Sequence, residues 1–329
     1  MEQQKMIDFM GQRKLAMILS MVLMIGSVVG LFVKGLNLGI DFTGGTIIEL
    51  AYEKPAEIDK IRKTLQKTGF ASATVQNFGS AKEVLIRIAP QEGMNSAQIS
   101  NKVLDALHTD ETKIDVRRVE FVGPQVGDEL TEDGALAVIY ALIGVLIYIA
   151  LRFEFRFALG SIAALVHDVT ITLGVFAWTQ LQFDLTVLAA ILAVIGYSLN
   201  DTIVVFDRVR ENFRTMREGT PVEVTNVAVN QMLSRTLMTS LTTLLVLLAL
   251  FFLGGEIIQD FALALIIGVV VGTYSSIYIA SAIALALGVS KADLMKPEKT
   301  GPTAEEAEAQ LQRAFLEAEA KRQAKLAKK

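Results

Sequence analysis

The sequence predicts an α-helical polytopic membrane protein with six transmembrane helices and one small α+β domain outside the membrane. The chain has 329 residues, of which 52% are hydrophobic. Its mean hydropathy of +0.45 is too high for an ordinary soluble domain. Six apolar runs approach the ~20 residues that a crossing helix needs. Between the first two runs lie roughly a hundred polar residues, enough for a folded domain.

Two of the six apolar runs are short, and the first run has features of a secretory signal. The predicted spans are Leu15–Val33, Ala135–Leu151, Phe157–Leu181, Leu185–Phe206, Thr236–Leu253 and Phe261–Leu287. The second and fifth are short, so we expect their helices to continue into neighbouring residues. The first resembles a secretory signal, but its core is too long and no A-x-A-like cleavage site follows. We therefore expect it to remain as an anchor.

Basic residues in the short loops predict the orientation in the membrane. The loop after the second span holds Arg152 and Arg156, and the segment after the fourth span holds four more arginines. The turns 180–184 and 254–260 contain neither Lys nor Arg. We therefore expect both termini in the cytoplasm and the polar region after the first span outside, on the opposite side of the membrane.

These observations divide the chain into predicted segments. The segments are a cytoplasmic N-terminus (1–14), a first transmembrane helix (15–33), an outer domain (34–132), helices two to six (133–289) with a cytoplasmic segment near 207–234, and a cytoplasmic charged tail (290–329). The tail places acidic residues before basic ones, which suits a helix macrodipole. We expect a solvated helix there, with a ribosome, lipid or partner contact as the alternative.

The order of strands and helices in the outer domain can be predicted from the sequence. The predicted elements are a strand (Gly45–Tyr52), a helix with Ile58, Ile61 and Leu65 on one face, strands Ala73–Phe78 and Glu83–Ile88, a helix capped by Asn95 or Ser96, and a strand Lys113–Val122. Helical and alternating apolar spacing supports these assignments. The order β-α-β-β-α-β is that of the ferredoxin-like split motif.

Ionisable residues interrupt three of the apolar runs, and they are the strongest functional signal. Asn200 and Asp201 lie in the fourth run, His167 and Asp168 in the third, and Arg235 at the start of the fifth. A carboxylate at the bilayer centre costs roughly 2.5–3.5 kcal/mol on insertion scales and usually marks a functional site. We therefore expect a charged species, most simply a proton, to move through the protein.

Asp201 is the central candidate of this predicted proton relay. Because Arg235 enters its span from the side nearest Asp201, the two side chains can meet at similar depth, where Arg235 would hold Asp201 ionised. Tyr197, Asp201 and Arg208 share one helical stripe, since offsets of four and seven residues recur on the same face. The alternative is that these groups only join helices by hydrogen bonds. The same alternative applies to His167 and Asp168. Packing is the expected role of the hydroxyls in the last two spans, with a hydrated lining of the relay as the alternative.

A glycine-rich run follows the first span: Gly39-Ile40-Asp41-Phe42-Thr43-Gly44-Gly45-Thr46. Its glycines imply a backbone geometry that side chains would forbid, and Asp41 can cap a turn. No Gly-Lys-Ser/Thr follows and no strand is expected before it, so it is not a nucleotide loop. We expect a hinge or junction between membrane and outer domain, with Gly39, Asp41, Gly44 and Gly45 as its key residues. The sequence shows no metal-ligand spacing and no catalytic triad, so we expect no enzyme activity, cofactor or metal, and no feature points to nucleic acid.

At these residues the chain resembles the SecF family, whose members are the smaller subunits of the bacterial SecD–SecF translocation accessory complex. The matching motifs are GIDFTGGT (Gly39–Thr46), VGPQVGDEL (Val122–Leu130), GYSLNDTIVVFDRVREN (Gly196–Asn212), LSRTLMTSLTTLL (Leu233–Leu245) and GTYSSIYIA (Gly272–Ala280). They cover nearly the whole chain up to about Val289. The tail carries no family pattern.

The resemblance implies a function that spacing could not show. SecF belongs to the resistance-nodulation-division superfamily, so this chain would form one half of a pseudo-symmetric twelve-helix unit with a SecD-type subunit. The family works beside the SecYEG channel, often with YajC, and uses the proton motive force to help export unfolded polypeptides. Asp201 and Arg235 match positions that the family associates with proton passage.

Three other functions compete with this one. Half of a small-molecule exporter of the same superfamily would need a much larger outer region. A passive scaffold would only stabilise the SecYEG channel. An intramembrane aspartyl protease would place an Asp in each of two neighbouring spans, but its Tyr-Asp and Gly-x-Gly-Asp motifs are absent, since Val166-His167 precede Asp168 and Leu199-Asn200 precede Asp201.

Overall fold

The computed structural model of the chain describes residues 6–91, 93–108, 114–216 and 218–290, and residues 308, 311–314 and 316 of the tail. Two compact units divide at Val289. All elements discussed below belong to the first unit. The predicted tail, 290–329, lies outside the described residues apart from those few positions.

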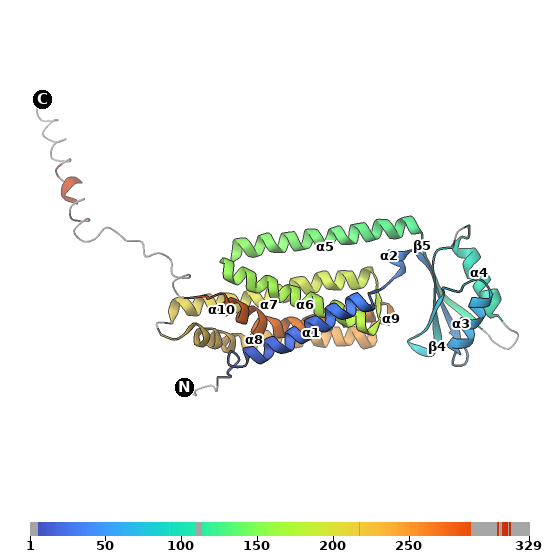
Figure 1. Ribbon diagram of the computed structural model, residues 1–329, viewed down its shortest axis with the longest axis horizontal. Helices are drawn as coiled ribbons and strands as arrows, with labels where there is room; N and C mark the ends of the chain where they lie inside the picture. The colour runs from blue at the N-terminus through green and yellow to red at the C-terminus, as the bar shows by residue number, and fades with distance from the viewer. Residues whose placement is uncertain are drawn as a thin grey trace, which may run out of the picture. The chain divides into compact units, whose positions relative to one another are not determined.

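Six long helical segments lie side by side in the first unit, and each is long and apolar enough to cross a membrane. The helices are α1 (Arg13–Val33), α5 (Pro124–Arg152), α6 (Phe155–Thr179), α7 (Leu185–Thr215), α8 (Pro221–Leu253) and α9 (Glu256–Ser275), which continues through a π-helical turn, η1 (Ser276–Ala280), into α10 (Ser281–Ala286). The prediction of six helices that could cross a membrane is confirmed (Figure 1). So is the expected lengthening of the second and fifth spans, which reach 29 and 33 residues.

The predicted cytoplasmic segment near 207–234 is mostly helical, because α7 and α8 both extend into it. Thr220 caps α8 through a capping box with Glu223, and Pro221 occupies the first helical position. This combination is a strong helix start signal. The two helices are therefore joined by a short turn at 216–220 rather than by a long loop.

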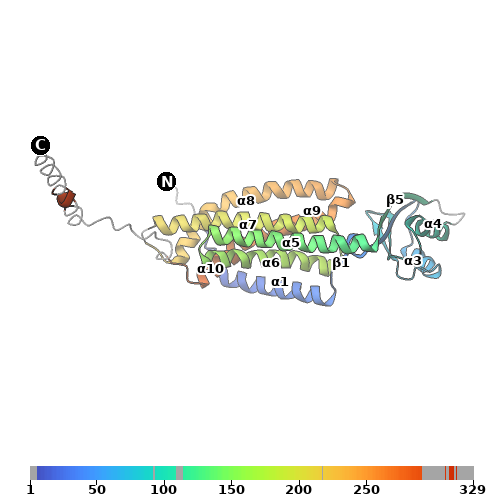
Figure 2. The ribbon, with the colours of Figure 1, turned by 90° about the horizontal axis from the view of Figure 1, so that it is seen from above.

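Helix α7 is the centre of the bundle and contacts α6, α8 and α9. Small residues permit the closest of these contacts: a Cβ added to Gly268 of α9 would lie 2.1 Å from Cγ2 of Val194 on α7. Helix α5 runs along the outside of the bundle in Figure 1, and α8 runs along its edge when the bundle is seen from above in Figure 2. Only 11% of the apolar window of α5 and 17% of that of α8 are buried within the chain.

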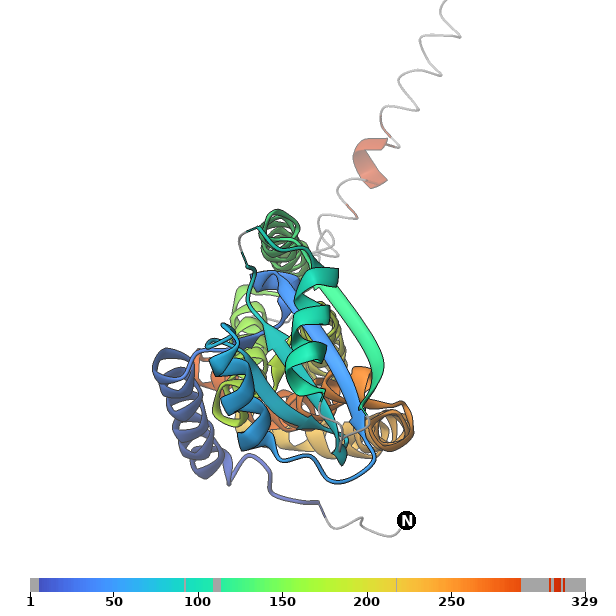
Figure 3. The same cartoon turned by 90° about the vertical axis from the view of Figure 1, so that its right-hand side faces the viewer.

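The domain between α1 and α5 is a four-stranded sheet covered on one face by two helices, which Figure 3 shows from the sheet end. Its elements are β2 (Gly45–Tyr52), α3 (Ile58–Lys67), β3 (Thr74–Phe78), β4 (Ser80–Ile88), α4 (Ser96–Leu107) and β5 (Ile114–Val122). The strand order is β3-β4-β2-β5, and all neighbours are antiparallel. The predicted β-α-β-β-α-β order is confirmed, and Asn95 caps α4 with a capping box.

Alternation along the strands gives this sheet two different faces. Ile48, Leu50 and Ile86 point towards α3 and α4 and form the main core of the domain. On the opposite face, Ile47 and Leu85 pack with Ile40 of the segment that leads into the sheet. The same face carries the acidic and basic groups that meet the helix bundle.

The glycine-rich run forms a tightly packed junction. A two-residue strand, β1 (Asn37–Leu38), precedes it and pairs in parallel with β6 (Gln182–Phe183), between α6 and α7. The expectation that no strand precedes the run was therefore wrong. Because its partner strand β6 lies far from β1 in the sequence, no local pattern could predict this pairing. The short helix α2 (Ile40–Thr43) follows and packs against the start of α5.

Gly45 is the position in this junction where a side chain is least tolerable. Its φ is +128°, and an added Cβ would lie 2.5 Å from the carbonyl oxygen of Ile88. We expect Gly45→Ala to destabilise the domain by roughly 1–3 kcal/mol, the cost of a strained backbone residue. Heat-induced protease sensitivity of the full chain measures this loss of stability. Gly69→Ala is the control, since Gly69 also has positive φ (+97°) but no atom within 4 Å of the added Cβ. Equal losses in the two variants would show that the contact with Ile88 contributes nothing.

Candidate functional site

Asp201 is a buried carboxylate without a complete set of partners. It lies near the middle of α7 with 3% of its surface exposed. Within the part of the chain that the structure describes, its Oδ2 atom has no hydrogen-bond partner. The charge that acts on it is Arg235 of α8. The predicted pair is thus close enough to interact electrostatically, although Arg235 makes no hydrogen bond to Oδ2. Burying a carboxylate this way is costly, which favours a functional reason for its presence.

The predicted stripe of Tyr197, Asp201 and Arg208 faces α8. Tyr197 donates its hydroxyl hydrogen bond to Oγ of Ser240 at 3.4 Å. About two turns beyond Asp201, Nε of Arg208 donates to Oε1 of Gln231 at 2.7 Å. Ser240 is also 2.7 Å from the hydroxyl of Thr273 on α9. Polar groups therefore line the contact between α7 and α8 on both sides of Asp201.

Asp168 is also fully buried, but its environment is the opposite of that of Asp201. Its Oδ1 lies 2.8 Å from Nδ1 of His167. Its Oδ2 accepts hydrogen bonds from Ser198 of α7 at 2.5 Å and from Ser275 of α9 at 2.7 Å. A single carboxylate thus joins α6, α7 and α9. Both carboxylate oxygens have partners, so the geometry suits a role in holding helices together.

His167 completes this network and leaves one atom unsatisfied. The side chain is buried, and its Nε2 has no hydrogen-bond partner. Its ring stacks on Tyr274, with 6.2 Å between centroids. Tyr274 in turn donates to the carbonyl oxygen of Ala16 on α1 at 2.7 Å. The network therefore reaches a fourth helix.

Sequence reasoning missed Ser198. The residue lies one turn before Asp201 on α7, so it shares the neighbourhood of both carboxylates. A hydroxyl three residues from an intramembrane Asp was the available signal. Ser275 was expected to serve packing, and the structure instead aims its hydroxyl at Asp168. Thr239, Thr242 and Thr243 do bond to carbonyls of their own helix.

The structure does not bring Asn200 into either cluster. Asn200 lies on an exposed face of α7, on the same side as Ala193 and Gly196. Asp207, farther along the helix, pairs with Arg152 at 2.5 Å and with Arg210 at 3.6 Å. These ion pairs lie at the end of the bundle away from the sheet.

At the other end of α7, the junction residues hold the helix start. Oδ2 of Asp41 accepts from the backbone N–H of Leu185 at 3.1 Å, while Asp184 caps the N–H of Val187. Asp41 was expected to cap a local turn, and it caps a helix 144 residues away. Sixteen residues separate Leu185 from Asp201, which is about 24 Å along the helix. The junction and Asp201 are therefore linked by one rigid element.

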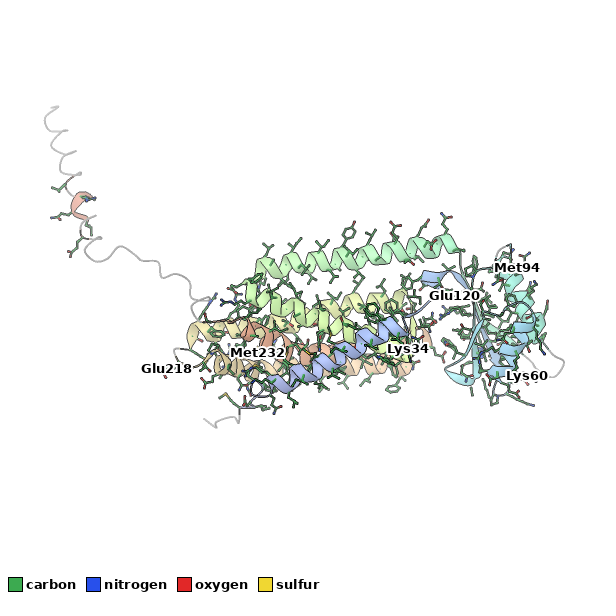
Figure 4. All side chains as sticks on the ribbon, viewed as in Figure 1. Lys34, Lys60, Met94, Glu120, Glu218 and Met232 are labelled. Atoms are coloured by element: carbon green, nitrogen blue, oxygen red, sulfur yellow. The ribbon has the colours of Figure 1, made fainter. Side chains whose placement is uncertain are left out.

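A cavity of about 180 Å³ lies between the sheet and the bundle. Its carboxylates come from the junction, the sheet, α9 and the start of α7: Asp41, Glu49, Glu120, Asp184, Glu256 and Asp260. Figure 4 labels Glu120 at this boundary. The turns that lacked Lys and Arg in the sequence thus meet here. Among the described residues, no group of three or more His, Asp or Glu side chains is arranged to hold a metal ion.

The comparisons with known proteins identify the family. Residues 102–290 match "Protein export membrane protein SecD/SecF, C-terminal", and residues 29–56 match the "SecD/SecF GG Motif". The chain is 53% identical over 297 residues to the protein translocase subunit SecF of Vibrio alginolyticus, covering 90% of this chain and 94% of that protein. It is 48% identical to SecF of Escherichia coli O157:H7, covering 90% and 93%. The chain belongs to the SecF family.

A solved structure supports the same assignment. The crystal structure of SecDF from Thermus thermophilus, a translocon-associated membrane protein, matches with a TM-score of 0.79 at 40% identity. The match covers 86% of this chain and 39% of the SecDF chain. SecF is therefore a subunit of the Sec translocase that associates with SecD, and it is a transport accessory protein rather than a member of an enzyme family. The predicted family, fold class and pathway are confirmed.

Proposed function

We propose that this chain works with a SecD-type partner to assist the late export of unfolded polypeptides across the bacterial inner membrane, driven by the proton motive force. The observation that carries the proposal is Asp201, a buried carboxylate with an unpartnered oxygen beside Arg235. In this cycle a proton from the periplasm neutralises Asp201 and the packing of α7 against α8 changes. Release of the proton to the cytoplasm restores the charge and its attraction to Arg235.

The two carboxylates take different roles in this proposal. Asp201 binds and releases the proton, with Arg235 and Tyr197 beside it. Asp168 and His167 set the position of α7, because the hydrogen bonds of Asp168 are already satisfied. Asn200, on the exposed face of α7, is available to the partner half.

The energy available is adequate for such a cycle. Moving one charge across the membrane potential yields ~2.3 kcal/mol per 100 mV. A two-state element with a gap of a few kcal/mol responds strongly to that amount. A second solved structure, described as SecDF in super-membrane-facing form, matches this chain with a TM-score of 0.64 at 40% identity.

The proposed topology places both termini in the cytoplasm and residues 34–132 in the periplasm. Arg152 and Arg210, with their acidic partners, lie at the bundle end opposite the sheet, whereas acidic residues dominate the sheet end. This asymmetry follows the positive-inside rule. The exposed apolar surfaces of α5 and α8 are available to the SecD-type subunit and to lipid. SecYEG and YajC are proposed neighbours from the family resemblance.

The proposal predicts that the export gain due to this subunit depends on the proton gradient. Membrane vesicles that contain the chain, a SecD-type partner and the export channel should export more polypeptide than vesicles without the pair. An ionophore should remove that gain while leaving ATP-driven export in place. A passive scaffold predicts a gain that persists with the ionophore, and a small-molecule exporter predicts no gain at all.

A further inference from the structure

Arg87 joins three separate parts of the chain at the boundary between sheet and bundle. It lies on β4, on the sheet face that points away from α3 and α4, as do Glu83 and Leu85. Its Nη1 donates to Oδ1 of Asn37 at 3.0 Å and to the carbonyl oxygen of Leu38 at 3.0 Å. Its Nη2 donates to Oε1 of Gln182 at 2.6 Å. One guanidinium therefore holds β4, β1 and β6 together.

The residues that Arg87 binds are themselves part of the packed junction. Asn37 and Gln182 are neighbours in the parallel pairing of β1 with β6. The N–H of Gly39 donates to the carbonyl oxygen of Phe183 at 2.7 Å. Because β6 runs directly into α7, the guanidinium is connected to the start of the helix that carries Asp201.

The chemistry of this contact requires arginine. The planar guanidinium has five donors in a fixed fork, so it can bind several acceptors from different elements at once. Arg87 is partly enclosed, and burial lowers the pKa of its guanidinium while the carboxylate of Asp184 opposes that shift. Its acceptors are neutral, so the bonds are directional contacts rather than an ion pair that would persist over a range of geometries.

We propose that Arg87 is a positioning residue that latches the periplasmic domain to the α6–α7 turn, so that displacement of α7 is transmitted to that domain. The expected effect on export rests on the proposed function, whereas the attachment of the domain to the α6–α7 turn rests on the hydrogen bonds of Arg87 alone. The sequence predicts a hinge or junction at the glycine-rich run. The hydrogen bonds of Arg87 hold β4 of the sheet to this junction.

The proposed latch can be tested by measuring the distance between the domain and the α6–α7 turn. The chain has no cysteine, so spin labels can be attached through Lys67→Cys on α3 and Thr179→Cys at the end of α6, both exposed positions. The complex with a cysteine-free SecD-type partner is reconstituted in lipid vesicles. We expect a narrow distance distribution with Arg87 present. Arg87→Ala should broaden it, as should Gln182→Ala, which removes one acceptor without changing the sheet.

Export by the same variants tests the transmission. Arg87→Ala should reduce the ionophore-sensitive part of export by about tenfold or more, because it removes three charge-assisted hydrogen bonds and the loss of one alone is worth about that factor. ATP-driven export should be unchanged, and the variant should still co-purify with its SecD-type partner, which a general folding defect would not allow. Arg87→Lys should recover only part of the loss, because an ammonium group lacks the fork. Arg117→Ala is the matched control, since Arg117 is an exposed arginine of the same domain, 3.6 Å from Asp115.

The outcomes separate the latch from the proposed function. An unchanged distance distribution in Arg87→Ala and Gln182→Ala overturns the latch, whatever export does. A broadened distribution with full ionophore-sensitive export overturns the transmission. Full recovery by Arg87→Lys contradicts the need for the fork. If Asp201→Asn keeps full ionophore-sensitive export, the proposed function fails, and the distance measurement still decides the latch.

Discussion

Asp201→Asn will assemble with its SecD-type partner but lose the ionophore-sensitive part of export. Asparagine has nearly the same shape as aspartate but cannot take up or release a proton in the cycle. One charge moved across ~100 mV is worth ~2.3 kcal/mol, a factor of about 50 in an equilibrium. Removing the charge removes that factor. The measurement is export by vesicles with and without an ionophore, beside co-purification of the partner.

The same substitution should not reduce stability. Oδ2 of Asp201 has no hydrogen-bond partner in the native fold, so neutralising this buried group removes a desolvation cost. Thermal unfolding of the purified complex should be unchanged or shifted upwards. Glu211→Gln is the control on α7, because Glu211 is exposed and pairs with Arg208 at 2.7 Å. Full ionophore-sensitive export by Asp201→Asn would refute the proton relay.

Asp168→Ala is expected to give the largest loss of stability in the bundle. The substitution removes contacts to His167, Ser198 and Ser275 at once. Hydrogen bonds between membrane helices average ~0.6 kcal/mol, so the two from Ser198 and Ser275 contribute about 1.2 kcal/mol, and the contact with His167 within α6 is lost as well. The space left by the carboxylate adds a cavity cost. Denaturation of the detergent-solubilised chain should therefore show a loss of about 2 kcal/mol or more.

Two variants make the Asp168 prediction specific. Asp168→Asn keeps an acceptor for the serine hydroxyls, so it should lose less stability and retain ionophore-sensitive export, unlike Asp201→Asn. Ser161→Ala is the control on α6, since the buried Ser161 hydroxyl bonds only to the carbonyl oxygen of Phe157 in its own helix. It should change stability little. A stability of Asp168→Ala equal to that of Ser161→Ala would show that the carboxylate does not hold the helices together.

The local elements of this protein could be predicted closely because their signals lie in neighbouring residues. Strand β2 begins and ends at Gly45 and Tyr52, as the alternation of apolar residues predicted. Helix α4 begins after Asn95, whose side chain and that of Gln98 form the capping box. The lengths of α5 and α8 were underestimated, because apolar content marks where a helix can lie in lipid but not where it continues into water.

The candidate site could be predicted only as a set of residue types. An Asp in an apolar run signals function wherever its helix lies, so Asp201 and Asp168 were both found. Their roles could not be separated, because the difference depends on partners from other helices. Ser275 is 107 residues from Asp168 in the chain. Arg87 gave no signal, since an arginine at its place in an alternating strand is ordinary.

The sequence by itself determined the six apolar helices, the order of the outer domain and the presence of charged groups within the bundle. Hydrophobic periodicity and end signals act over a few residues and need no knowledge of the fold. Only the tertiary structure decided which carboxylate is satisfied, which element Asp41 caps and what Arg87 joins. The contacts that decide these points connect residues that lie 30 to 144 positions apart, and they form only when the helices pack against one another.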